Sequence, residues 1–105
     1  MSSRWMGRYR YDYYGKNIKL CCIYEEIANQ QLIILLSNPL PQESEYPDLI
    51  DVISEVDGVG NCSVEHRYKL VCGVNFWQFN SDETVKIIGD ILDDFFGRQK
   101  EKNNV

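Results

Sequence analysis

Four cysteines and a single histidine are the residues of this 105-residue sequence whose types suit nucleophilic or metal chemistry. Metal sites draw on pairs such as Cys-x2-Cys, and Cys21, Cys22, Cys62 and Cys72 contain no such pair. Successive residues of a strand point to opposite faces, so Cys21 and Cys22 could not share one ion there. Cys22, Cys62 and Cys72 are expected on the inward face of the sheet, where cysteine behaves as a small hydrophobic residue. The sequence therefore predicts neither a metal site nor a cofactor.

A cysteine nucleophile would need His66 as its base within about 3 Å of the sulfur. Cys72 is expected on the same sheet face as His66, though not directly opposite it. The carboxylate pairs Asp82-Glu83 and Asp93-Asp94 belong to a helix start and to a solvated helix face. The Gly-x-Gly at 58–60 follows a predicted helix, whereas phosphate-binding loops precede one. We therefore predict no catalytic residue and keep a small thiol-dependent or other enzyme as the second alternative function.

Charge is distributed unevenly along the chain, whose formal net charge is −5. Residues 1–20 carry +4, residues 21–97 carry −11 and residues 98–105 carry +2. The acidic body argues against non-specific nucleic-acid binding. The N-terminal segment is basic and rich in tyrosine, however, so nucleic-acid binding by this segment is the first alternative function. Tyrosine rings stack on bases and guanidinium groups bind phosphates, and the expected contacts are Arg4, Arg8 and Arg10.

Length and composition predict a single domain over residues 1–105, with a basic arm at 1–7 and a flexible tail at 98–105. The hydrophobic fraction of 44% is that of a globular protein. No apolar run approaches the roughly 20 residues of a membrane span, and the first residues do not resemble a signal peptide. We therefore expect a cytoplasmic protein with no membrane partner.

Hydrophobic periodicity predicts the element order β-β-β-α-β-β-α. Pro47 should open the first helix, Gly58 should end it, and Asn80 or Ser81 should cap the second, which Gly97 ends. A helix over 21–36 is the alternative to two of the strands. The expected strands are 8–14, 17–25, 31–37, 61–66 and 69–75, and the expected helices are 47–57 and 81–96.

These elements predict an α+β fold, a two-layer sandwich in which two helices cover one face of an antiparallel sheet of about five strands. The part from 31 to 96 resembles the first five elements of a ferredoxin-like split β-α-β. The closing strand of that arrangement is missing, and 17–25 can take its place beside 31–37, which makes the arrangement a permuted one. The expected sheet order is 8–14, 17–25, 31–37, 69–75, 61–66.

Strand alternation directs Leu32, Ile34 and Leu36 toward the helices and leaves Ile33 and Leu35 on the face without helices. An apolar outer face is unusual in a two-layer sandwich, so something should cover it: a second copy, another protein, a small apolar ligand or the chain's own N-terminal arm. The sequence therefore predicts a small non-enzymatic binding domain that forms a homodimer or binds a protein partner. The predicted interaction face is Tyr9, Tyr11, Tyr13, Ile23, Ile33, Leu35 and Val71, with Cys21 beside Ile23.

Trp77 lies in an aromatic segment, 76–79, between the last strand and the last helix. Part of this segment should close the end of the core. If Trp77 is exposed, it is a second anchor for a partner, because tryptophan is enriched among binding hot spots.

Overall fold

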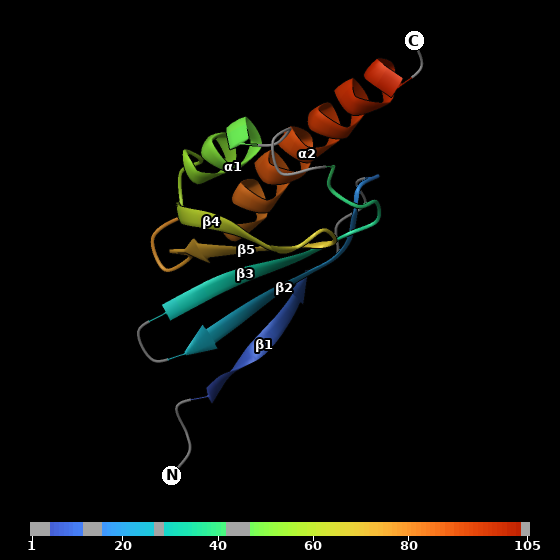
Figure 1. Ribbon diagram of the computed structural model, residues 1–105. Helices are drawn as coiled ribbons and strands as arrows, with labels where there is room; N and C mark the ends of the chain where they lie inside the picture. The colour runs from blue at the N-terminus through green and yellow to red at the C-terminus, as the bar shows by residue number, and fades with distance from the viewer. Residues whose placement is uncertain (1–4, 12–15, 27–28, 42–46, 104–105) are drawn as a thin grey trace.

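The chain folds in two layers, an antiparallel sheet and a pair of helices that lie on one of its faces (Figure 1). The computed structural model describes residues 5–11, 16–26, 29–41 and 47–103, the first of these ranges by its backbone. The sheet order is β1-β2-β3-β5-β4, and every neighbouring pair is antiparallel. The predicted α+β class, with an antiparallel sheet and two helices, is confirmed. The elements are β1 (Trp5–Tyr11), β2 (Ile18–Glu26), β3 (Asn29–Leu36), α1 (Pro47–Ser54), β4 (Val59–His66), β5 (Lys69–Val74) and α2 (Ser81–Asn103).

The strand β3 lies between β2 and β5, and its side chains divide between the two faces as alternation predicts. Leu32, Ile34 and Leu36 are buried beneath the helices, and Ile33 and Leu35 are half-buried on the other face. Residues 21–26 and 29–36 pair as two strands, so these residues do not form the alternative helix. The predicted first strand, 8–14, is displaced toward the N-terminus, and its residues 12–14 lie outside the described part of the chain.

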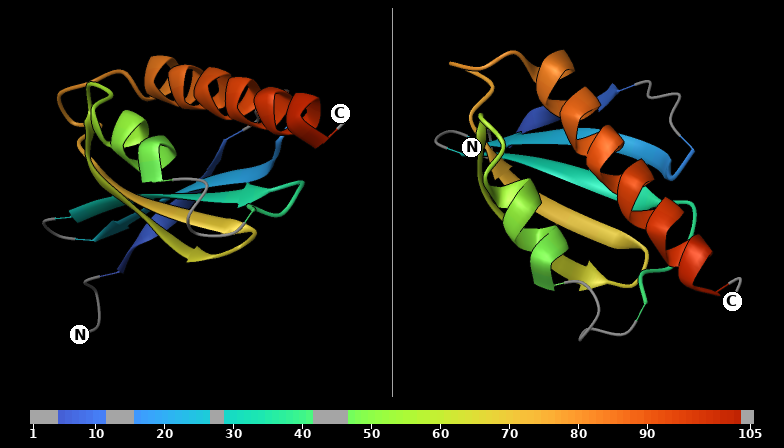
Figure 2. Two further views of the ribbon diagram at one scale, coloured as in Figure 1. Left: turned by 45° about the horizontal axis from the view of Figure 1, so that its top comes forward. Right: turned by 90° about the horizontal axis from the view of Figure 1, so that it is seen from above.

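The core lies between the sheet and the helices, the two layers seen in Figure 2. Branched aliphatic residues of β3 and β5 meet the apolar side of α2 there. Burial of these side chains from water is the main force that holds the two layers together. The buried apolar residues are Ile18, Cys21, Ile23, Leu32, Ile34, Leu36, Leu40, Leu49, Ile53, Leu70, Cys72, Val74, Val85, Ile88 and Leu92.

The helix α1 begins at Pro47 as predicted but ends at Ser54, earlier than expected. Its last turn tightens, since the Val56 N–H donates to the Ile53 carbonyl at 3.1 Å. Gly58 has a φ of 93°, so its predicted left-handed backbone is confirmed, but it lies four residues beyond the last residue of α1 and does not itself end the helix.

The helix α2 is capped by Asn80, whose side-chain oxygen accepts a hydrogen bond from the Glu83 N–H at 2.9 Å. The prediction that Gly97 ends this helix and that 98–105 forms a flexible tail is wrong, because α2 continues to Asn103. Gly97 does not adopt a positive φ, and Arg98 pairs with Asp94 one turn earlier at 2.9 Å. No helix in the described ranges is long and apolar enough to cross a membrane.

Candidate functional site

The face of the sheet opposite the helices carries a continuous set of apolar side chains. Across it, Cys22 of β2 pairs with Ile33 of β3, which pairs in turn with Val71 of β5. A second row joins Leu20 to Leu35. Cross-strand neighbours lie on the same face of a sheet, so these residues form one patch. The helix-free face is defined here as Leu20, Cys22, Tyr24, Gln31, Ile33, Leu35, Ser63, Glu65, Lys69 and Val71.

Ile23 does not belong to this face, and its predicted place there is wrong. Ile23 pairs with Leu32, Cys21 pairs with Ile34, and both Ile23 and Cys21 are buried beneath the helices. A register shift between Ile18 and Leu20 is the physical reason, because one extra residue there reverses the alternation of β2.

Because of the same shift, the prediction that Cys22 faces inward is wrong. The shift also brings to the helix-free face three side chains that the sequence pattern places on the covered face. These are Leu20, Cys22 and Tyr24, all half-buried. A bulge depends on how two strands pair, and the uninterrupted alternation of β2 in the sequence carries no signal of it.

The backbone of β1 extends the sheet beyond β2, and its register separates its arginines from its tyrosines. Arg8 pairs with Tyr24 and Arg10 with Cys22, two members of the helix-free face. Tyr9 pairs instead with Ile23, and Tyr11 with Cys21, and neither partner belongs to the helix-free face. The register therefore does not place these two predicted residues on that face. The predicted Tyr13 and Arg4 lie outside the described residues.

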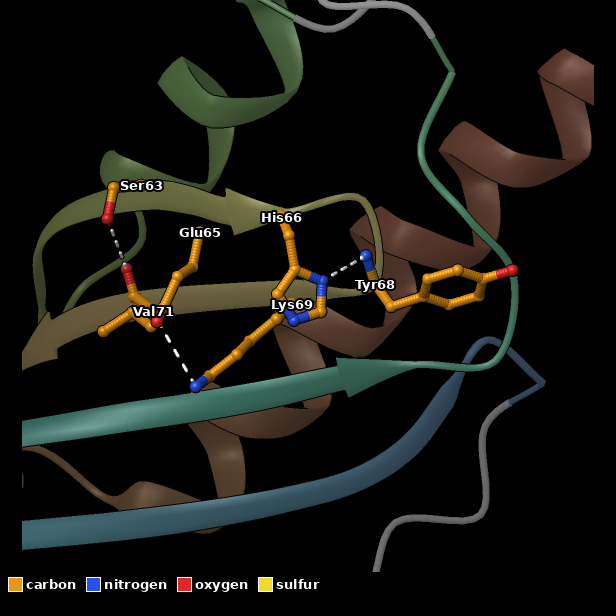
Figure 3. A network of polar contacts seen from close by, with 6 residues as sticks. All are labelled: Ser63, Glu65, His66, Tyr68, Lys69 and Val71. Carbon is orange, nitrogen blue, oxygen red and sulfur yellow. Dashed lines mark hydrogen bonds and ion pairs between the residues drawn. The ribbon is translucent and has the colours of Figure 1, made fainter.

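Polar groups border the apolar patch on the β4 side (Figure 3). The Lys69 ammonium lies 3.4 Å from the Glu65 carboxylate, and the Ser63 hydroxyl donates to the Val71 carbonyl at 3.4 Å. Together with Tyr24, Gln31, Ile33 and Val64, these residues line a shallow hollow of about 600 Å³. An apolar floor with one pair of opposite charges at its margin suits a protein surface or an apolar group better than an ion.

The cysteines on the covered side of the sheet are structural. Cys62 and Cys72 are directly opposite each other on β4 and β5, and a hydrogen bond joins their sulfur atoms. That hydrogen bond and burial raise the pKa of Cys72, whereas the hydrogen bond lowers the pKa of Cys62. Burial raises the pKa of Cys21 to about 12, with a smaller contribution from Cys22. Cys21 and Cys72 are therefore thiols, not thiolates, at neutral pH.

His66 lies far from the thiols it would have to activate. It is four residues beyond Cys62 on β4, which corresponds to roughly 13 Å along an extended strand. Its Nδ1 accepts a hydrogen bond from the Tyr68 N–H at 3.2 Å in the turn between β4 and β5 (Figure 3). This geometry does not form the nucleophile and base of a thiol enzyme. Within the described residues, no cluster of three or more histidine, cysteine or acidic side chains could hold a metal ion.

Trp77 is 57% exposed in the turn that joins β5 to α2. Its neighbour Phe76 packs against the core, and the Phe76 N–H donates to the Gln30 side-chain oxygen at 2.6 Å. The segment thus closes the end of the core with Phe76 and leaves Trp77 and Phe79 outside. Trp77 lines a separate hollow at the end of the sheet and is not part of the helix-free face.

A larger hollow, of about 810 Å³, lies near the start of β2 and the second half of α2. Several of its polar side chains already make hydrogen bonds within the fold. The Asn17 amide donates to Asp93 at 2.8 Å, and Arg67 donates through Nε to the Leu40 carbonyl at 2.9 Å. These contacts fasten α2 and the segment after β3 to the sheet, which is a structural role.

No family model, no curated protein and no solved structure matches this chain.

Proposed function

We propose that this chain is a small binding domain that associates with a second copy of itself through the helix-free face. The observation that carries the proposal is the apolar row Cys22, Ile33 and Val71 across the three central strands, with Leu20 and Leu35 beside it. An apolar face with no helix over it loses unfavourable contact with water when a second sheet packs against it.

The fold within this proposal is a ferredoxin-like split β-α-β in a permuted form. The support is the position of β2, which pairs antiparallel with β3 where the closing strand of that arrangement would lie. This arrangement puts both helices on one face and leaves the other to a partner. A reducing compartment such as the cytoplasm suits the four free thiols.

The charges of β4 and β5 are compatible with a second copy as the occupant. A closed two-fold contact places the same patch against itself, so any charge on the patch must find an opposite charge on the same patch. Lys69 and Glu65 supply such a pair, and Glu65 is still half-exposed beside Lys69. Around the two-fold axis, Glu65 of one chain can meet Lys69 of the other.

The size of the face corresponds to a small interface. The eight residues of β3 span about 26 Å, and five strands spaced by about 4.8 Å span about 19 Å. The resulting footprint of roughly 500 Å² per chain is smaller than the ~800 Å² that each partner contributes to a standard interface, and it lies near the lower limit for a specific contact. Two such sheets would pack face to face at a distance of about 10 Å.

The test is the mass of the native protein at micromolar concentration, measured by sedimentation or light scattering. We expect twice the 12.3 kDa of one chain. Ile33→Lys should give the monomer mass, because it would bury an unpaired charge at the centre of the contact. Circular dichroism should show that the variant keeps its fold, since Ile33 faces away from the core.

Ile87→Lys is the matched control. Ile87 is exposed on α2, on the opposite layer, so the same substitution there should leave the dimer intact. A wild-type protein that stays monomeric, or an Ile33→Lys variant that stays dimeric, would refute the proposal.

Nucleic-acid binding is a second candidate, favoured by the register that pairs Arg8 with Tyr24 and Arg10 with Cys22 at the edge of the helix-free face. Guanidinium groups beside an aromatic side chain suit a single-stranded nucleic acid. The affinity for a single-stranded oligonucleotide should fall with rising salt, and it should weaken in the Arg8→Ala, Arg10→Ala double variant. An affinity that is unchanged by salt or by this double substitution would exclude β1 as the phosphate-binding element.

A further inference from the structure

The two helices lie side by side over the sheet (Figure 2), and an apolar groove runs between them. The groove has a volume of about 410 Å³ and lies on the opposite side of the molecule from the helix-free face. Its floor consists of α1 residues Leu49 and Val52 and α2 residues Ile87, Ile91 and Phe95.

Two residues of this floor are unusually exposed for their type. Val52 and Ile87 are each 46% exposed, although Leu49 and Leu92 on the same helices are buried. Val52 follows Leu49 by one helical turn, a spacing that is typical of core positions. The two helices instead leave Val52 and Ile87 open to water, on facing sides of one groove, where a third apolar element can cover both.

The charges along the groove are predominantly acidic. Asp48 of α1 and Asp90 and Asp94 of α2 line it, and Arg98 is the single basic residue among the lining side chains. Arg98 already pairs with Asp94 at 2.9 Å, which leaves Asp48 and Asp90 without a positive partner among the described ion pairs. No residue of α1 is basic. The groove therefore combines an apolar floor with a negatively charged rim.

We propose that this groove binds an amphipathic helix whose apolar stripe is flanked by lysine or arginine. The apolar stripe contacts Val52 and Ile87, and the basic residues meet Asp48 and Asp90. The eight residues of α1 give the groove a length of about 12 Å, and apolar residues at i, i+3, i+4 and i+7 of a helix cover about 10 Å. Charge complementarity selects a basic partner and opposes an acidic one.

The experiment uses the full chain and a labelled synthetic peptide of about 15 residues, with leucine at i, i+3, i+4 and i+7 positions and lysine elsewhere. Fluorescence anisotropy measures its affinity, and a peptide with glutamate in place of lysine is the first control. We expect the lysine peptide to bind and the glutamate peptide to bind at least ~10-fold more weakly. Ile87→Ser should weaken binding of the lysine peptide by about 10-fold.

Two matched variants separate the groove from a general attraction between opposite charges. Asp90→Lys, in the groove, should weaken binding clearly more than Asp57→Lys, which makes the same charge change at an exposed position outside it. Tyr68→Ser removes an exposed apolar side chain elsewhere and should leave the affinity unchanged.

Equal losses in Asp90→Lys and Asp57→Lys, or an Ile87→Ser affinity equal to that of wild type, would overturn the proposal. So would the absence of binding, or binding of both peptides alike. Ile33→Lys, which tests self-association, should not change the affinity for the peptide, so the two proposals can fail separately.

Discussion

Gly58 and Gly97 both follow an apolar helical pattern in the sequence, but they differ in backbone conformation and in the space around them. Gly97 has a helical backbone and nothing within 4 Å of the position that a Cβ would take. Gly58 has a φ of 93°, and a Cβ there would lie 3.0 Å from the Phe79 Cβ and 3.1 Å from the Thr84 Oγ1.

Alanine at these two positions should therefore change the free energy of unfolding in opposite directions. Gly97→Ala should raise it by about 1 kcal/mol, because alanine restricts the unfolded chain and is the better helix former. Gly58→Ala should lower it by about 2 kcal/mol, because the left-handed backbone and the tight contacts both oppose a side chain. Chemical denaturation measures both values. A loss of stability in Gly97→Ala would contradict the observed continuation of α2.

Ionisation of Cys21 should make the protein less stable at alkaline pH. Its pKa is about 12 in the folded chain, against 9.0 ordinarily, because burial opposes the thiolate. A raised pKa contributes stability that is present below pH 9 and is lost as pH rises toward 12. The free energy of unfolding that is lost through this thiol should reach about 2 kcal/mol at about one and a half pH units above its ordinary pKa of 9.0.

The variant Cys21→Ala isolates this effect. It lowers stability near neutral pH by leaving a small cavity, but its free energy of unfolding should fall less steeply above pH 9 than that of wild type. The difference in slope should approach about 1.4 kcal/mol per pH unit. Urea titrations at several pH values measure it, and parallel slopes would show that Cys21 ionises freely in the folded chain.

Among the elements, those whose pattern is local could be predicted from the sequence. The apolar side of α2, through Val85, Ile88 and Leu92, and the alternation of β3 both follow from spacing within one segment. The facing of β2 could not be predicted, because the bulge before Leu20 is decided by pairing with β3. The end of α2 was missed because Gly97 is tolerated inside a helix when good helix formers such as Arg98 follow it. The bulge placed Ile23 beneath the helices and brought Leu20, Cys22 and Tyr24 to the helix-free face.

The bulge of β2 leads to a prediction about deletion. Ile18 pairs with Leu36 and Leu20 with Leu35, so Lys19 between them has no partner on β3. Lys19 is exposed. Deleting Lys19 should keep all these pairs and change the free energy of unfolding by less than about 1 kcal/mol, the value of one hydrogen bond.

A second deletion, of Ile33, is the control for the first, because the pairing of β3 with β5 has no bulge that could absorb it. It should move either Leu32 or Ile34 from the core to the opposite face, so cooperative unfolding should be lost. Circular dichroism and thermal denaturation distinguish the two outcomes. Loss of the fold on deletion of Lys19 would mean that the bulge itself is required.

At the scale of the whole molecule, the sheet has two apolar faces but only one layer of helices. The covered face holds the core, through Leu32, Ile34 and Leu70, and the other holds the row of Cys22, Ile33 and Val71. The sequence predicted this division for β3, because alternation in a central strand is local. It could not predict the groove at Val52 and Ile87, because that groove depends on the distance between two helices.

Self-association through the helix-free face should make the thermal stability depend on concentration. If folding and dimer formation are coupled, a tenfold increase in concentration stabilises the folded dimer by about 1.4 kcal/mol, shared by two chains. For chains of this size, that corresponds to a rise in Tm of about 4 °C. Scanning calorimetry over a hundredfold range of concentration measures it.

Ile33→Lys should remove this dependence, and its Tm should equal that of wild type extrapolated to low concentration, because the substitution lies outside the core. Ile87→Lys should retain the dependence, since Ile87 lies on the helix layer. The Tm of the wild type could instead be independent of concentration over a range in which sedimentation shows dimers. That result would mean that the chains separate before they unfold. A Tm that rises with concentration equally in all three proteins would assign the contact to another surface.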